Sequence, residues 1–194
     1  MWLRSHLPLR PELALAATLA LLLGSCAGAT DQTGLEQTLA ANDSATVALG
    51  QWCAARHIAD PPTIRALADR SAKLPASPKV RAALGVGPDE PVAYRHVRLA
   101  CGETVLSVAH NWYVPARLTP AMNHSLESTD TPFGKVVAPL GFHRERLGEM
   151  RGRMAECPQR TILSHRALLR LADGRAISLV VECYTRANLN RAKG

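Results

Sequence analysis

The feature of this sequence that most constrains its fold is a series of strand-like segments in the C-terminal half. Five segments alternate valine, leucine and isoleucine with polar residues, and they cover residues 92–101, 103–114, 141–154, 161–172 and 175–186. Two of the breaks, Cys101-Gly102 and Asp173-Gly174, are tight turns, and the second is a strong hairpin signal. Hairpins join antiparallel neighbours, so we expect a mostly antiparallel sheet of five or six strands.

Helices are predicted before these strands and between the second and third of them. The segment Leu35–His57 has helical spacing, and Asn42-Asp43-Ser44 interrupts it with a new N-cap, which indicates two short helices. Ser77-Pro78 begins a further short helical turn that ends at Gly85. The proline-containing segment Thr119–Ala138 is interpreted as short helices that cap the sheet. The pattern therefore predicts an α+β domain with helices packed on the sheet.

The N-terminal residues resemble a bacterial export signal. The uninterrupted apolar run at residues 13–23 is too short to span a bilayer comfortably, because a transmembrane helix needs about 20 such residues. Leu23-Gly24-Ser25-Cys26 resembles the lipobox of bacterial lipoproteins, in which the cysteine becomes the lipidated first residue. An ordinary secretory signal cut after Ala27 or Ala29 is the alternative. Both interpretations predict export.

We therefore expect three parts: a signal peptide at residues 1–25, a tether at 26–33 and a single domain at 34–194. A domain of this length can build one core of its own. We expect a monomer that is periplasmic or anchored to the membrane through a lipid on Cys26.

The cysteines of the domain indicate disulfides rather than a metal site. They are Cys53, Cys101, Cys157 and Cys183, and their spacing matches no zinc pattern. Cys53 and His57 lie four residues apart, but two ligands are too few for zinc. An even number of cysteines in an oxidising compartment predicts two disulfides and no metal.

Charge and aromatic content favour a small anionic ligand over nucleic acid. The chain carries 23 basic and 16 acidic residues, yet the arginines are scattered and only 4% of residues are aromatic. A nucleic-acid surface would need basic clusters and stacking side chains, so we expect none. No phosphate-cradling glycine loop or nucleophile elbow is present in the sequence, which argues against kinase and classical hydrolase chemistry.

Two charged residues occupy sheltered strand positions. Arg95 shares its strand face with apolar residues, and Glu182 lies on a largely uncharged row of the last strand. A guanidinium on an apolar face needs an anionic partner, because it keeps its charge and is costly to bury alone. Arg95 and Glu182 therefore either form buried salt bridges, with each other or with other charges, or line a ligand site.

The order of three motifs resembles the bacterial chorismate pyruvate-lyase family. Tyr94–Leu99, followed by a hairpin and a strand that ends in Val114-Pro115, is similar to the family's arginine-bearing strand. Thr131–Lys135 is similar to its Thr-Pro-Leu-Gly-Arg helix start, with Phe133 in place of leucine. The segment from Leu168 to Glu182 is similar to its closing hairpin and glutamate. The segment Thr63–Arg70 departs from the pattern, since it reads as a helix where the family has a strand.

The resemblance implies a chorismate lyase-like fold, with the helical cap over a ligand cavity. It implies that Arg95 binds a ligand carboxylate, that Glu182 meets the ring hydroxyl and assists proton transfer, and that Phe133, at the turn with Gly134, presents its backbone N–H to the ligand. The reaction would eliminate pyruvate from chorismate to give 4-hydroxybenzoate, without metal or organic cofactor. Orientation and one proton-transfer group would suffice for such a reaction.

Export conflicts with this activity, because chorismate is made and consumed in the cytoplasm. One fold can host several functions. The main alternative is therefore a non-catalytic periplasmic binding or accessory protein that uses the same cavity for an aromatic carboxylate. A structural envelope lipoprotein with a collapsed cavity is a third class.

If Arg95 and Glu182 share the cavity face, strand parity restricts the disulfides. Cys101 then lies on that face and Cys183 on the other, which excludes a bond between them unless a β-bulge changes the parity. Cys183 is expected to bond either Cys53, on a helix against the outer apolar row, or Cys157, before the fourth strand.

Overall fold

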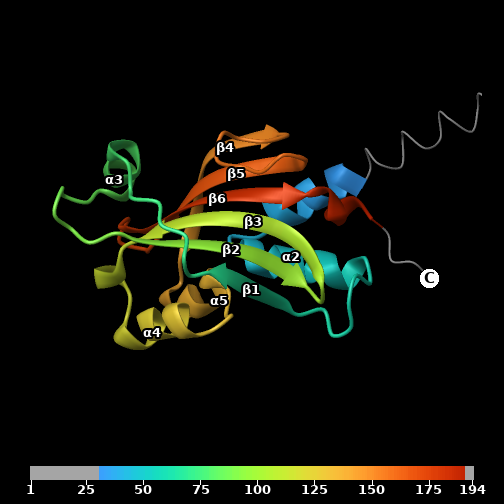
Figure 1. Cartoon of the computed structure of the whole chain (residues 1–194), viewed down its shortest axis with the longest axis horizontal. Helices are drawn as coiled ribbons and strands as arrows, with labels where there is room; N and C mark the ends of the chain where they lie inside the picture. Colours follow the sequence, from blue (N-terminus) through green and yellow to red (C-terminus); the bar gives the residue numbers. More distant parts are fainter. Residues whose placement is uncertain (1–30, 191–194) are drawn as a thin grey trace, which may run out of the picture.

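The computed structural model describes residues 31–190 and contains a six-stranded sheet with the order β1-β2-β3-β6-β5-β4 (Figure 1). Every neighbouring pair of strands is antiparallel. The strands are β1 (Ile64–Asp69), β2 (Ala93–Cys101), β3 (Thr104–Tyr113), β4 (His143–Arg151), β5 (Thr161–Arg170) and β6 (Ala176–Thr185). The five predicted strands are confirmed as β2 to β6.

The sixth strand corrects one prediction. Thr63–Arg70 was expected to be helical, but β1 pairs with β2 from Ile64 opposite Cys101 to Asp69 opposite His96. Ile64 and Ala66 are buried and Arg65 is exposed, which is the alternation of a strand that covers a core on one face. A six-residue segment gains more from the free edge of β2 than from an isolated helical turn, whose nucleation is unfavourable.

The helices begin where the capping residues predict. After a helix at residues 31–40, the chain forms α2 (Ala45–Ala55), α3 (Pro78–Leu84), α4 (Pro120–Ser128) and α5 (Phe133–Val137), with short 3-10 turns at Pro115–Arg117, Ala138–Leu140 and Arg186–Leu189. Ser44 accepts a hydrogen bond from the Val47 N–H at the start of α2, and Ser77 accepts one from the Val80 N–H at the start of α3. α3 ends at Gly85 in the left-handed conformation, with φ of 62°.

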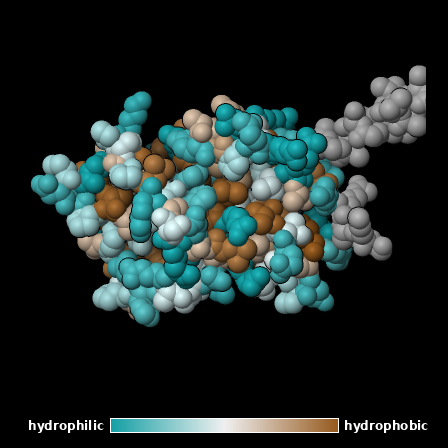
Figure 2. Space-filling view, in the orientation of Figure 1, coloured by the Kyte–Doolittle hydropathy of each residue, from teal (hydrophilic) through white to brown (hydrophobic). Residues whose placement is uncertain are grey.

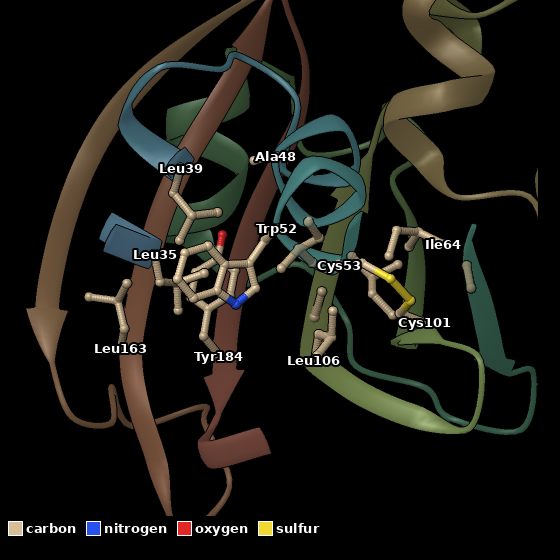
Figure 3. Packing of buried hydrophobic residues seen from close by; sticks show 14 of the residues in the cluster. Leu35, Leu39, Ala48, Trp52, Cys53, Ile64, Cys101, Leu106, Leu163 and Tyr184 are labelled. Carbon is tan, nitrogen blue, oxygen red and sulfur yellow. A yellow bond between two sulfur atoms is a disulfide. The ribbon is translucent and has the colours of Figure 1, made fainter. Parts of the chain in front are cut away.

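The two faces of the sheet are covered by different elements. On one face, which lies behind the strands in Figure 1, the helix at 31–40 and α2 pack onto Tyr184 and Leu163. Figure 3 shows Trp52 and Tyr184 of this cluster beside Leu35. On the other face, Leu84 of α3 packs with Leu179, Val181 and Cys183, among others. Figure 2 shows hydrophobic side chains near the middle of the near face, with hydrophilic ones around them.

The disulfides are Cys53–Cys101 and Cys157–Cys183, with Cα atoms 6.4 Å and 5.5 Å apart. The Cys101–Cys183 pairing is absent, as strand parity required. The pairing of β2 with β3 does contain a bulge, but the extra residue is Leu106 of β3, so Arg95 and Cys101 keep the same parity. The expected position of the Cys53 helix was wrong, because α3, not α2, covers the outer apolar row.

The expected signal peptide at residues 1–25, the lipidation site Cys26 and most of the tether lie outside the described residues. Within residues 31–190, no helix combines the length and the apolar character that crossing a membrane requires.

Candidate functional site

A cavity of about 50 Å³ lies between the sheet and the starts of α2 and α5. The sheet contributes residues of β2 to β6, among them Arg144 of β4 and Leu169 of β5, and α5 contributes its first two residues. Arg95, Phe133, Gly134 and Glu182, the four residues singled out from the sequence, all belong to the lining. Strands far apart in the chain and the predicted helical cap therefore meet at one cavity.

Arg95 is a buried cation whose hydrogen-bonding capacity is only partly used. Its side chain rises from β2 and the residue is 7% exposed. Nη2 donates to the main-chain oxygens of Thr129 and Thr131, at 3.3 and 3.2 Å, in the loop before α5. Nε and Nη1 have no hydrogen-bond partner among the described residues. Burial lowers the pKa of Arg95, which is the cost of holding a guanidinium without an anion.

Asn111 lies directly opposite Arg95 in the register of β2 and β3, and both residues line the cavity. The hydroxyl of Ser178, on β6, donates to the Asn111 side-chain oxygen Oδ1. That bond fixes the orientation of the amide and leaves its Nδ2 group without a hydrogen bond to any described residue. Arg95 and Asn111 together place N–H donors side by side on the cavity face. The sequence alone did not indicate that Asn111 and Ser178 belong to the site, because neutral polar residues are ordinary in strands.

Glu182 forms a buried ion pair whose partner sequence reasoning did not identify. Nη1 of Arg144, from β4, donates to Oε1 at 3.2 Å, and Nη2 of the same guanidinium donates to Oε2. The hydroxyl of Tyr184 donates to Oε2 at 2.9 Å. The salt-bridge interpretation is thus right for Glu182, with Arg144 as its partner. No signal in the sequence distinguishes Arg144, because β4 carries charged residues on both of its faces.

The electrostatics of this pair hold the neighbouring groups in fixed protonation states. Burial acts to lower the pKa of Arg144, but the Glu182 carboxylate outweighs it and raises that pKa. Burial and Glu182 raise the pKa of Tyr184 well above its ordinary value, so the phenol stays a neutral donor. His165, opposite Glu182 on β5, has its pKa lowered by burial.

Among residues 31–190, no group of three or more histidine, cysteine, aspartate and glutamate side chains is arranged to hold a metal ion. The cavity lining instead holds two guanidinium groups, Arg95 with unused donors and Arg144 paired with Glu182, and the carboxylates of Glu182 and Asp43.

Comparison with solved structures identifies the class of fold. The effector domain of PhnF from Mycobacterium smegmatis superposes with a TM-score of 0.51 at 13% identity, over 68% of this chain and 88% of that one. The structure of PhnF from the same organism gives a TM-score of 0.53 at 13% identity, over 77% of this chain and 66% of that one. The predicted class, an α+β domain of chorismate lyase-like fold, is confirmed.

No protein-family model matches the sequence. The chain is 43% identical over 170 residues to the protein described as "Uncharacterized protein y4mC" from Sinorhizobium fredii (strain NBRC 101917 / NGR234), and the match covers 78% of this chain and 72% of that protein. The chain belongs to the family of y4mC.

Proposed function

We propose that this domain binds a small carboxylate, with an aromatic acid as the first candidate, through Arg95 in the cavity. The observation that carries the proposal is the buried guanidinium of Arg95, whose Nε and Nη1 have no hydrogen-bond partner in the described part of the chain. A carboxylate accepts two parallel N–H bonds from such a fork, and its charge offsets the cost of burying the cation. Asn111, and the backbone N–H groups of Phe133 and Gly134, would complete the contacts. One of the solved structures that share this fold is described as the effector domain of PhnF.

A chorismate pyruvate-lyase activity is the second candidate, because Glu182 lines the same cavity as Arg95. In that reaction Arg95 would bind a carboxylate of chorismate, and Glu182 would contact the ring hydroxyl and assist proton transfer while pyruvate leaves. The ion pair with Arg144 favours binding over catalysis, because both oxygens of Glu182 already accept hydrogen bonds. Arg144 would have to release an oxygen before Glu182 could serve the reaction.

We also propose that the chain is exported and anchored through Cys26. The two disulfides support export, since such bonds persist in oxidising compartments. An exported domain would not meet cytoplasmic chorismate, which again favours binding. Radiolabelled palmitate should label the wild-type chain and not a Cys26→Ala variant; equal labelling of both would contradict the anchor.

The proposed function is tested by calorimetric titration of the purified full chain with 4-hydroxybenzoate. We expect binding, and we expect Arg95→Met to weaken it at least about tenfold, since a hydrogen bond to a charged group is lost. Arg98→Met is the matched control: this arginine lies on the same strand but is exposed, and its loss should leave binding intact. No binding, or an equal effect of both variants, would refute the proposal.

A parallel incubation with chorismate separates the two candidates. Appearance of 4-hydroxybenzoate and pyruvate, lost in Glu182→Gln, would establish the lyase. Binding of 4-hydroxybenzoate without turnover of chorismate would establish a binding domain.

A further inference from the structure

Arg95 has more unused hydrogen-bond donors than one carboxylate in the cavity can accept. A guanidinium carries five N–H groups, and the two on Nη2 serve the main-chain oxygens of Thr129 and Thr131. Three N–H groups remain, one on Nε and two on Nη1, and a carboxylate accepts two parallel N–H bonds. At least one donor of this buried cation is therefore left for a second acceptor.

A second hollow is lined by Arg95. This hollow, called here the α4 hollow, has a volume of about 190 Å³ and lies where the end of β1, the start of β2 and the end of α4 meet. Tyr113 of β3 belongs to its lining, together with Arg70 and Lys73, which follow β1. These three residues do not line the cavity. The α4 hollow is thus a separate space that shares Arg95 with the cavity.

Two guanidinium groups lie next to each other at the α4 hollow. The main-chain oxygen of Thr129 accepts a hydrogen bond from Nη2 of Arg95 at 3.3 Å and one from Nη2 of Arg70 at 3.4 Å. Nε of Arg70 donates to the main-chain oxygen of Glu127 at 2.9 Å, which anchors this side chain on α4. Neither guanidinium forms an ion pair with a carboxylate of residues 31–190. An anion bound to both would relieve the repulsion between them.

Tyr113 adds a hydroxyl group to these cations. The residue is 5% exposed, and its ring packs against Phe133 with the centroids 5.5 Å apart. Its hydroxyl forms no hydrogen bond with the described part of the chain, although a buried phenol usually has a partner. Burial, and after it Glu127, raises the pKa of Tyr113. The hydroxyl therefore stays protonated and can donate a hydrogen bond to a ligand.

The charges of the α4 hollow favour an anion. Three cations stand against two carboxylates in its lining: Arg70, Lys73 and Arg95 against Asp69 and Glu127. Oδ1 of Asp69 is already occupied, because it accepts hydrogen bonds from the N–H groups of Ser71 and Ala72 at 3.1 and 3.2 Å. Glu127 is exposed to solvent, so its charge is screened more than that of the buried Arg95.

We propose that the α4 hollow binds a phosphate group, either free or as the monoester of a small molecule. Arg95, Arg70 and the Tyr113 hydroxyl donate to its oxygens. Three donors from three segments of the chain suit the several oxygens of a phosphate group better than the two oxygens of a planar carboxylate. This second anion site goes beyond the proposed carboxylate site in the cavity.

Calorimetric titration of the full chain with inorganic phosphate and with glycerol 3-phosphate tests the proposal, in a phosphate-free buffer of low ionic strength. We expect binding, and the tighter of the two compounds identifies the free ion or the monoester as the source. Arg70→Met should weaken it at least about tenfold, because a hydrogen bond to a charged group is lost. Arg65→Met is the matched control: this arginine is exposed on β1, lies beside Glu103 and does not line the hollow.

Glu127→Gln tests the site in the opposite direction. This change removes a negative charge from the lining and keeps the length of an exposed side chain, so phosphate binding should tighten several-fold. Glu103→Gln is its control, because this exposed glutamate lies in the turn between β2 and β3, outside the hollow. Its affinity for phosphate should equal that of the wild type.

Benzoate, a minimal aromatic carboxylate, separates the α4 hollow from the cavity. Arg70→Met should leave benzoate affinity intact, whereas Arg95→Met should weaken both benzoate and phosphate, since Arg95 lines both spaces. Thermal unfolding of each variant verifies that it is folded.

The outcomes are distinct. If neither phosphate compound binds, or if Arg70→Met and Arg65→Met have equal effects, the α4 site is overturned while carboxylate binding stands. An equal loss of benzoate and phosphate in Arg70→Met would mean that both anions share one site, which also overturns the inference. Binding of phosphate without binding of benzoate or 4-hydroxybenzoate would refute the proposed function alone.

Discussion

At the scale of single residues, Arg144 neutralises the buried carboxylate of Glu182 in the cavity lining. Arg144→Met would leave the Glu182 carboxylate buried with Tyr184 as its only side-chain donor among residues 31–190. We expect the free energy of unfolding to fall by about 3 kcal/mol, the lower end for breaking a buried pair. Replacing both partners, as Arg144→Met with Glu182→Gln, should recover part of that loss. Urea unfolding measures both; a single variant as stable as the wild type would contradict the prediction.

Introducing a negative charge at Asn111 tests whether this residue lies beside the bound anion. Asn111→Asp would place a carboxylate opposite the guanidinium, where it would pair with Nε or Nη1 and take the position of the ligand. Benzoate binding should therefore be lost in Asn111→Asp and only reduced several-fold in Asn111→Ala. Calorimetry decides: if the aspartate variant still binds benzoate as well as the alanine variant does, Asn111 does not neighbour the anion.

His165 gives the stability a dependence on pH. Burial lowers its pKa below the ordinary value of 6.5, so the folded protein binds fewer protons there than the unfolded chain. The stability associated with neutral His165 is fully present above pH 6.5, and the free energy of unfolding decreases as the pH falls below that value. In the folded protein, Glu182 and Glu149 act to raise the pKa of His165, and Arg144 and Arg146 act to lower it. We expect His165→Asn to lose less stability than the wild type between about pH 7 and pH 5 in urea unfolding; parallel profiles would exclude this role.

On the strands, the residues of the site were predictable only where they violated a pattern, whereas Phe133 and Gly134 were predicted from the resemblance of Thr131–Lys135 to a family motif. Arg95 and Glu182 could be recognised because each is a charge on an otherwise uncharged strand face. Asn111 and Ser178 could not, since neutral polar residues are ordinary in strands. Arg144 could not either, because its burial arises from tertiary packing against β6 and not from its own strand.

At the scale of elements, the contact of α2 with α5 sets access to the cavity. Gly134→Ala would press a methyl group against Ser44 Oγ and cost about 1–3 kcal/mol of folding free energy, as overpacking does. Ser44→Ala alone would cost about 1 kcal/mol through the lost cap of α2. The double variant should lose less stability than the sum of the two single losses, because the Ser44 Oγ atom that clashes with the new methyl group is gone. Thermal or urea unfolding of the four proteins measures this; strict additivity would show that the two residues do not contact each other.

Strands with hairpin turns were predicted better than the edge strand. The bounds of β2 to β6 agree with the alternating residues and turn residues in the sequence. β1 is short, and it forms a strand because it pairs with β2. The position of α2 was likewise set by tertiary packing, since both faces of the sheet offer apolar rows. Local pattern therefore determined the strands, but not which helix covers which face.

At the scale of the whole molecule, one disulfide ties down each face of the sheet. Cys53–Cys101 joins α2 to the end of β2, and Cys157–Cys183 joins the loop before β5 to the C-terminal part of β6. Both close long loops, of 48 and 26 residues in sequence separation, so each should contribute about 3 kcal/mol. We expect Cys53→Ala/Cys101→Ala and Cys157→Ala/Cys183→Ala each to lower the urea midpoint, and the reductant dithiothreitol to remove both contributions from the wild type. A midpoint unaffected by reductant would contradict this.

The order of the strands also has a kinetic consequence. β2 with β3 and β5 with β6 are hairpins of neighbouring segments, whereas the ladder between β3 and β6 joins Asn111 to Val180 across a long stretch of chain. Arg95 and Asn111 belong to one hairpin, and Ser178 and Glu182 to the other. Neither hairpin alone therefore forms the cavity, and we expect their encounter to be the slow step of folding, because long-range pairing must first overcome loop-closure entropy. A ligand in the cavity would bind only after that encounter, and it would act as a clamp that slows the separation of the two hairpins.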